Sequence, residues 1–168
     1  YHYDVPVERN ASSFSMLNVG GPDLEIPFRD NLRNGGTGKN YGIEFTLEKQ
    51  FSNSHYYMLT GSVYESKYKG SDGVEHNTVF NGNFALNVLG GTEFALGRGI
   101  TMMLDGRVSY IGGRRHSPIL LEESREAGYT VTDEARAYEE RYSNYFRADL
   151  KLGVRMNFSN TSHTIGID

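Results

Sequence analysis

Cysteine and tryptophan are absent from the 168 residues, and proline occurs only four times. Without cysteine the chain has no disulfide framework, no thiolate chemistry and no zinc ribbon. It also lacks an apolar run of the roughly 20 residues that a membrane-spanning helix needs. Twelve tyrosines, nine phenylalanines and twenty glycines suit strands and turns better than helices. The composition therefore predicts an all-β protein.

Basic residues are fewer than acidic ones, 17 against 21. The net charge is -4 at neutral pH, and the pI is near 5.7. Nucleic-acid-binding domains usually present a basic face, so we expect no nucleic-acid partner. Ser, His and Asp are present, but no motif places a nucleophile beside a base. The sequence therefore gives no support for an enzyme, and we expect no catalytic residues.

Histidine gives no sign of a metal centre. The five histidines are dispersed, and only His76 lies close in sequence to carboxylates, those of Asp72 and Glu75. A site for a hard cation needs several oxygens at regular spacing around a turn glycine, and this loop has too few. We therefore expect a solvated loop here, with no metal and no cofactor.

Alternation of apolar and polar residues is the dominant pattern, and it is clearest in residues 146–158. There the even-numbered residues are apolar, and the odd-numbered ones are polar, charged or glycine. Successive side chains of a strand point to opposite faces, so this stretch predicts a strand with one oily and one charged side. The same pattern predicts five further strands, at residues 41–51, 55–68, 80–96, 100–110 and 163–168.

The connections between these strands differ in length. Short turns follow Phe51, Leu96 and Phe158, whereas longer segments precede residue 41 and follow Tyr68 and Arg115. A short helix is predicted at residues 120–127 within the long connection 112–144. Alternation of short and long connections is typical of outer-membrane barrels, which have short periplasmic turns and longer extracellular loops.

The N-terminal part is expected to be less regular. Residues 1–4 have the pattern of the last turn of a strand. Residues 5–40 are expected to be irregular, because the breakers Gly20-Gly21-Pro22 and Gly35-Gly36 interrupt them. Gly36-x-Gly38 is interpreted as a turn rather than a phosphate-binding loop, since the spacing is wrong and a strand follows.

Two architectures fit the alternation. In a transmembrane β-barrel the apolar side faces lipid. In a soluble antiparallel barrel or sandwich it faces inward and binds a small apolar ligand. Residues 80–96 far exceed the about 5–6 residues of an average globular strand, which favours the membrane barrel. Matched parity also requires that neighbouring strands keep their apolar sides together. The expected neighbours are Phe45 and Gly61, Val63 and Gly82, and Leu86 and Tyr110.

Four stretches resemble the late barrel strands of TonB-dependent outer-membrane receptors. The closest variety is the one common in Bacteroidetes-type bacteria, often with a carboxypeptidase-regulatory-like domain ahead of the plug. The stretches are GTGKNYGIEFTLEK (36–49), SKYKGSDGVEHNTVFNGNFALNVLGGTEF (66–94), DGRVSYIGGRRHSPI (105–119) and NYFRADLKLGVRMN (144–157).

This resemblance implies an antiparallel transmembrane β-barrel of about 22 strands with long extracellular loops and an N-terminal plug. Residues 1–168 would supply about six strands of its C-terminal part, without the plug and the last strands. The implied function is TonB-driven import of a siderophore, cobalamin, glycan or peptide across the bacterial outer membrane. The implied partners are outer-membrane lipid, TonB acting through the plug, the nutrient and a surface lipoprotein.

The charged side of the strands is expected to line the barrel lumen. Arg or Lys facing lipid at the membrane midplane would cost roughly 2–4 kcal/mol, so these side chains should point inward. We expect a ladder of cross-strand ion pairs contributing about 0.2–1 kcal/mol each; a substrate path is the alternative. The residues expected to face the lumen are Asp105, Arg107, Arg147, Asp149, Lys151 and Arg155.

Ligand contact is expected in the long connection after residue 111. Arg114, Arg115 and His116 stand where a strand ends and a loop begins, and Tyr129 and Tyr138 add aromatic surface. Loops on a rigid scaffold carry a disproportionate share of binding residues. Packing of loop against loop is the alternative role for these five side chains.

Overall fold

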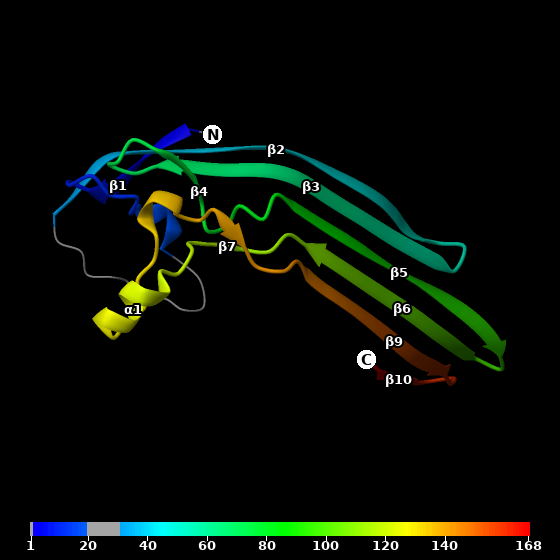
Figure 1. Cartoon of the computed structure of the whole chain (residues 1–168). Helices are drawn as coiled ribbons and strands as arrows, with labels where there is room; N and C mark the ends of the chain where they lie inside the picture. The colour runs from blue at the N-terminus through cyan, green and yellow to red at the C-terminus, as the bar shows by residue number, and fades with distance from the viewer. Residues whose placement is uncertain (1, 20–30) are drawn as a thin grey trace. The chain divides into compact units, whose positions relative to one another are not determined.

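Long antiparallel strands make up most of the computed structural model, which describes residues 2–19 and 31–168 (Figure 1). The long strands match stretches in which apolar and polar residues alternate. The protein is therefore all-β in class. The strands are β1 (His2–Glu8), β2 (Leu32–Ser52), β3 (His55–Lys69), β4 (Glu75–Asn77), β5 (Phe84–Gly97), β6 (Ile100–Ile111), β7 (Arg115–His116), β8 (Glu140–Arg141), β9 (Tyr145–Asn157) and β10 (Ser162–Ile167). The helical segments are η1 (Met16–Asn18), α1 (Leu121–Ala127) and η2 (Glu134–Arg136).

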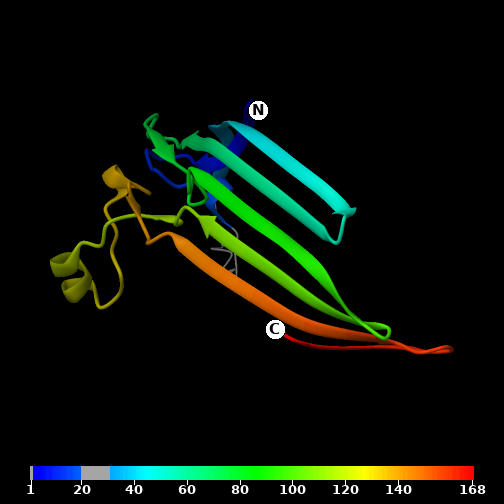
Figure 2. The same ribbon diagram turned by 90° about the vertical axis from the view of Figure 1, so that its right-hand side faces the viewer.

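The main sheet is a meander with strand order β1-β2-β3-β5-β6-β9-β10, and β4 pairs with β3. Strands β7 and β8 form a separate two-stranded sheet. Figures 1 and 2 show β5, β6 and β9 running side by side. Within residues 2–19 and 31–168, β1 and β10 are the two edges of the main sheet, which does not close on itself. None of the helices in these ranges is both long and apolar enough to cross a membrane.

The chain divides into two compact units, which we call the loop unit and the sheet unit. The loop unit comprises Tyr1–Ile43, Tyr64–Asn83 and Gly112–Ser143. The sheet unit comprises Glu44–Val63, Phe84–Ile111 and Asn144–Asp168. The short turns β2–β3, β5–β6 and β9–β10 all belong to the sheet unit, whereas the longer connections belong to the loop unit.

The hairpin turns of the sheet unit have the backbone geometry that tight turns require. Asn53 and Ser54 join β2 to β3 with φ of 51° and 66°. Positive φ at both central residues matches the right-handed twist of the flanking strands. Arg98, with φ of 53°, stands between two glycines that also have positive φ and joins β5 to β6.

Most of the predicted strands are confirmed. Strands β3, β6, β9 and β10 lie within one or two residues of the predicted ranges, and α1 begins one residue later than predicted. The neighbours Leu86 and Tyr110 are directly opposite in the register. Phe45 also covers Gly61, because a Cβ on Gly61 would lie 2.6 Å from the Phe45 Cζ atom.

The prediction of an irregular segment at residues 5–40 is wrong for residues 5–8 and 32–40, which belong to strands. Strand β1 continues to Glu8, β2 begins at Leu32, and the two pair antiparallel from His2↔Lys39 to Glu8↔Leu32. Gly36 lies in β2 and not in a turn. A Cβ there would collide with Val7 and lie 2.7 Å from the Lys69 carbonyl oxygen, so close packing explains the glycine. The breakers Gly20-Gly21-Pro22 lie outside the described residues, as does Tyr1.

The predicted strand at residues 80–96 begins too early. Strand β5 starts at Phe84, because residues before it form turns in which Asn81 N donates to Thr78 O at 3.0 Å and Gly82 N donates to Phe80 O at 2.8 Å. Val63 is therefore opposite Phe84 rather than Gly82. The shift is two residues, so the apolar residues keep the same face.

The buried apolar core is small. Among the described residues the buried apolar side chains are Val5, Val7, Tyr68 and Ala137, and all four belong to the loop unit. In the sheet unit large apolar side chains are exposed instead. The sheet unit thus consists of a single layer of strands.

Candidate functional site

One face of the sheet unit carries the charged residues predicted to face a lumen. Asp105 is opposite Lys151 in the β6–β9 register, and Arg107 is opposite Asp149. Opposite residues share a face, and so do alternate residues of one strand. All six predicted residues, including Arg147 and Arg155, therefore share one side of the sheet. That this side lines a lumen stays a prediction.

A hollow of about 640 Å³ lies along this polar face. Its lining includes Asp105, Arg107, Arg147, Lys151 and Tyr56. The Tyr56 hydroxyl donates to Asp105 Oδ1 at 2.8 Å, so β3 adds an aromatic side chain to the charged strands β6 and β9. The sequence prediction missed Tyr56. The sequence does contain a signal for it, because Tyr56 alternates in step with the polar residues of β3 and is therefore expected on their face.

The ion pairs of this face differ from the predicted ladder. Arg147 Nε donates to both oxygens of Asp149, at 2.8 and 2.9 Å, along a single strand. Arg107 is opposite Asp149 but forms no ion pair with any described residue. Arg155 pairs with Glu93 on β5 at 2.6 Å, with β6 between the two strands. Arg147 and Arg155 are thus paired with carboxylates, but not in a β6–β9 ladder.

The other face of the sheet unit is apolar and open. Leu150 is 61% exposed and Ile165 is 65% exposed, although both are large aliphatic side chains. No described residue forms a second layer over this face. The other exposed apolar residues at matching register positions include Tyr57, Val63, Leu86, Val88, Phe94, Ile100, Val108, Tyr110, Phe146, Leu152, Val154 and Ile167.

Two arginines predicted as ligand contacts occur at the start of the long connection in the loop unit. Arg115 is fully engaged: it donates to the carbonyl oxygens of Asn81 and Glu139 and to Asn83 Oδ1, at 2.9–3.0 Å. It therefore clamps three segments together. The Arg114 guanidinium lies 5.3 Å from the centroid of the Phe80 ring and is exposed. Of the two, Arg114 is the one accessible to a ligand.

The remaining predicted contacts are dispersed. The His116 ring is 4.3 Å from the Tyr142 ring, centroid to centroid. Tyr138 packs edge-on against Tyr68, and burial raises the pKa of its phenol. Tyr129 is 71% exposed and follows α1. The structure thus assigns packing to His116 and Tyr138 and leaves Tyr129 free for contact.

A buried asparagine network supports these loops, and the sequence prediction missed it. Asn81 is completely buried. Its Nδ2 donates to Glu65 and Asn77, and its Oδ1 accepts from the backbone N–H of Ser66 at 3.1 Å. Asn83 donates to the other oxygen of Glu65 at 2.8 Å. Because buried polar groups need partners, this network fixes the connection between β3 and β5.

The prediction of a solvated loop around His76 is wrong. The His76 side chain is buried, its Nε2 lies 2.8 Å from Asp72 Oδ2, and its ring packs on Tyr68. The Tyr68 hydroxyl donates to the Ser13 carbonyl at 2.8 Å, which ties the segment after β1 to β3. Burial is the main cause that raises the pKa of Tyr68. Long-range packing of residues 10–15 on this loop explains the error.

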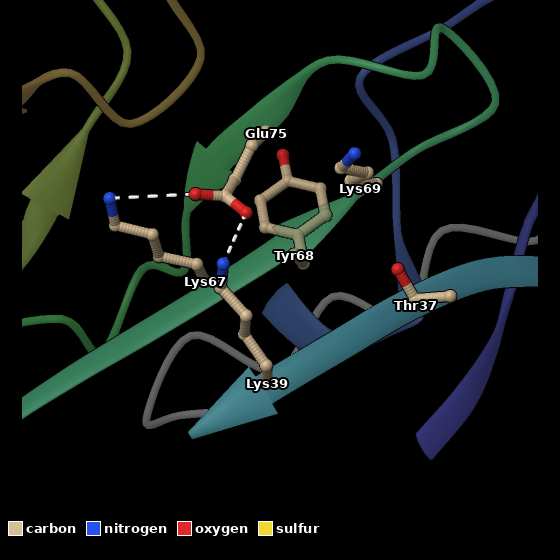
Figure 3. Close-up of a pocket in the computed structure, with 6 residues that line it drawn as sticks. All are labelled: Thr37, Lys39, Lys67, Tyr68, Lys69 and Glu75. Atoms are coloured by element: carbon tan, nitrogen blue, oxygen red, sulfur yellow. Dashed lines mark ion pairs between the residues drawn. The ribbon is translucent and has the colours of Figure 1, made fainter. Parts of the chain in front are cut away.

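Three lysines surround a smaller hollow of about 220 Å³ in the loop unit (Figure 3). Lys39 Nζ lies 2.6 Å and Lys67 Nζ 3.6 Å from the two oxygens of Glu75. The hydrogen bond with Lys39 lowers the pKa of Glu75, and the same bond raises the pKa of Lys39. Lys69, Tyr68 and Thr37 complete the lining.

In the described part of the chain, charged groups thus gather around free space at the polar face of the sheet unit and at the lysine hollow. Among the described residues, no three His, Asp or Glu side chains come close enough together to hold a metal ion. No protein-family model, curated protein or solved structure matches the chain.

Proposed function

We propose that the chain forms part of the wall of a transmembrane β-barrel in a bacterial outer membrane. The observation that carries this proposal is the open apolar face of the sheet unit. Soluble monomers rarely expose contiguous apolar patches larger than a few hundred Å². A face built from Leu150, Val154, Ile165 and their neighbours on the strands β3, β5, β6, β9 and β10 needs an apolar medium, and lipid supplies one.

Strand length and connection length support the same proposal. Strands β5, β6 and β9 have 14, 12 and 13 residues. A tilted transmembrane strand needs about 9–11 residues, so each is long enough to cross the hydrocarbon layer. The short turns β2–β3, β5–β6 and β9–β10 would then form the periplasmic rim, and the longer connections of the loop unit would be extracellular.

Within such a barrel we assign the chain to a TonB-dependent receptor that imports a scarce nutrient. The charged residues around Asp105 and Lys151 would line the lumen. Arg114 and Tyr129 would be the loop side chains available to the nutrient. Further strands would pair with the free edges β1 and β10, since unpaired edges invite aggregation. TonB would act through an N-terminal plug, and a surface lipoprotein would be a further partner.

Nitroxide labels at Leu150 and Lys151 test the membrane barrel directly. These residues are neighbours on β9 and point to opposite faces of the sheet. In the protein reconstituted into vesicles, oxygen, which dissolves in lipid, should relax the label at position 150 much more than the label at 151. A water-soluble nickel chelate should show the reverse preference. Equal accessibility of both labels to both reagents would rule out the proposal.

A second function has one observation in its favour. A hollow of about 370 Å³ on the apolar face is lined by Val88, Val108, Ala148 and Leu150 among others. A soluble antiparallel barrel could use such a surface to bind a small apolar ligand. That function requires the apolar face to be enclosed, so a monomeric, detergent-free preparation with a cooperative melting transition would support it.

A further inference from the structure

The lysine hollow of the loop unit combines excess positive charge with free space. Lys39, Lys67 and Lys69 line it together with a single carboxylate, that of Glu75. Asp4 is opposite Thr37 in the β1–β2 register but is not part of the lining. Three ammonium groups against one carboxylate leave two positive charges uncompensated at the hollow itself. A bound anion would compensate these charges.

The three lysines are not equally satisfied. Figure 3 shows the Glu75 carboxylate between the ammonium groups of Lys39 and Lys67, with Lys69 outside this pair. Lys69 forms no ion pair with any residue in the described part of the chain, and its side chain is exposed. The Tyr68 hydroxyl is already used by the Ser13 carbonyl. An incoming anion would therefore find one free ammonium group and two that it can share with Glu75.

Apolar surface adjoins the hollow on the same strand. Thr37, Lys39, Tyr41 and Ile43 are alternate residues of β2 and so point to one side. Tyr41 is 58% exposed and Ile43 is 78% exposed. Both belong to the loop unit, as do the lysines. An apolar strand segment that ends in a cluster of lysines matches the boundary between lipid chains and charged head groups, where lysines hold their ammonium groups at the interface.

From this juxtaposition we infer that the lysine hollow binds the phosphate of a lipid head group on the outer surface of the barrel. The inference rests on the proposed membrane location. The lipid chains would lie against Tyr41 and Ile43, while the phosphate would accept hydrogen bonds from the ammonium groups of Lys39, Lys67 and Lys69. Glu75 would compete with the phosphate, because its carboxylate pairs with the ammonium groups of Lys39 and Lys67.

Native mass spectrometry of the purified protein in detergent provides the test, with phosphatidylglycerol as the anionic probe and phosphatidylcholine as the zwitterionic one. Phosphatidylglycerol should bind more tightly, and each Lys→Gln change at 39, 67 or 69 should weaken its binding about fivefold. Glu75→Gln should have the opposite effect and strengthen binding several-fold, because it releases Lys39 and Lys67. A role for these residues in loop packing alone does not predict that gain.

A control for charge alone is the triple variant R125Q/R136Q/R141Q, which removes three positive charges from the long connection of the loop unit, more than any single lysine variant removes. It should leave phosphatidylglycerol affinity unchanged. Equal affinity for the two lipids, or no gain in Glu75→Gln, would overturn the inference. If inorganic phosphate competes as strongly as the lipid does, the hollow is a site for free phosphate and the lipid assignment is wrong.

The same samples can carry the labels at positions 150 and 151, which keeps the two proposals separate. If the Lys→Gln variants bind phosphatidylglycerol as the wild type does while the two labels still alternate in accessibility, the lipid site is overturned but the membrane barrel is not. Loss of the alternating pattern would overturn the membrane barrel, and with it the lipid site.

Discussion

The loop unit and the sheet unit are built from the same kind of strand but treat apolar and polar side chains in opposite ways. The loop unit buries Tyr68 and Val7 and satisfies buried polar groups such as Asn81 with each other. The sheet unit leaves Leu150 and Ile165 exposed and has charged side chains on its other face. The first arrangement suits a segment folded in water, whereas the second suits one folded against lipid.

This contrast teaches that alternation alone does not reveal which side of a strand is the inside. In β1 of the loop unit, alternate residues Val5 and Val7 are buried in a core. In β9 of the sheet unit, alternate residues Leu150 and Leu152 are exposed. Both strands have period-two patterns, and only the presence or absence of a covering layer tells them apart. Mutations that act differently in water and lipid can therefore test the comparison.

Leu150→Arg should have the largest effect. On a lipid-facing strand an arginine near the membrane midplane costs about 2–4 kcal/mol of the free energy of unfolding. Lys151→Arg, one residue away on the polar face, should cost almost nothing. Urea unfolding of both variants in lipid vesicles measures the difference. Similar small effects for both variants would mean that the apolar face does not contact lipid.

Asn81→Ala tests the loop unit in the same way. The change leaves the Ser66 N–H without its acceptor and removes one hydrogen bond each from Glu65 and Asn77. One buried unsatisfied group costs about 1–3 kcal/mol, so this variant should lose protease resistance first in the connection between β3 and β5. Limited proteolysis with mass spectrometry locates the cleavage. The labels at 150 and 151 should be unaffected, and a change there would contradict the independence of the two units.

Two glycines allow a matched comparison of packing. Gly36→Ala places a methyl group against Val7 and the Lys69 carbonyl, and overpacking of this kind costs about 1–3 kcal/mol. Gly106→Ala meets only the Asp149 carbonyl oxygen at 3.9 Å. It should be neutral or stabilise by about 0.4–1 kcal/mol, because it reduces the freedom of the unfolded chain. Thermal unfolding of both variants checks the signs, and equal destabilisation would contradict the difference in packing.

The buried phenol of Tyr68 predicts a pH effect confined to the loop unit. Burial raises the pKa of Tyr68 in the folded state, so the folded form keeps its proton when the unfolded form begins to lose it. This contribution to stability is complete below about pH 10 and is lost as the pH rises above that value. The half-buried Tyr138 acts in the same direction.

Tyr68→Phe removes the Tyr68 part of this dependence. At neutral pH the variant should lose about 0.5–1.5 kcal/mol, because the hydrogen bond to Ser13 is gone. Above about pH 10 the gap between wild type and variant should narrow. Denaturant unfolding followed from pH 7 to 11 measures it. A constant gap over this range would show that Tyr68 titrates like an exposed tyrosine.

The strands of the sheet unit were the easiest part to predict from sequence, because each has a local period-two pattern. Strand β1 was predicted only to Asp4, although Val5 and Val7 are at alternate positions. The start of β2 was missed because it has no such pattern. Residues 32–40 are mostly Gly, Asn and charged residues, and they form a strand because they pair with β1. Phe80 and Gly82 continue the apolar parity of β5, yet side-chain hydrogen bonds of Asn81 turn the chain there. Pairing and hydrogen bonding with residues distant in sequence leave no periodic signal in the sequence itself.

The candidate sites show the same limit. Alternation was enough to assign Asp105 and Lys151 to one face, because face membership depends only on parity. It could not predict that Arg115 would become a structural clamp or that His76 would be buried, since both depend on contacts with remote segments. The lysine hollow was missed because Lys39 and Lys67 come from different strands and meet only at Glu75.

The smallest expected effect concerns the pair Glu93–Arg155 on the polar face. These side chains are 26% and 35% exposed and meet at 2.6 Å across the intervening strand β6. A double-mutant cycle with Glu93→Gln and Arg155→Gln should give a coupling of about 0.2–1 kcal/mol, since solvent screens partly exposed pairs. Urea unfolding in vesicles measures the four variants.

The single variants of this pair also distinguish two roles of the polar face. If Glu93 and Arg155 only brace the wall, the single variants should change stability slightly, and uptake of a nutrient should stay at the wild-type level. If the positive groups form a path, Arg155→Gln should slow uptake far more than its small stability cost explains, and Glu93→Gln should not. The pairing with Glu93 favours the bracing role, because a guanidinium held at 2.6 Å by a carboxylate is less available to a passing ligand than that of Arg107, which forms no ion pair with any described residue.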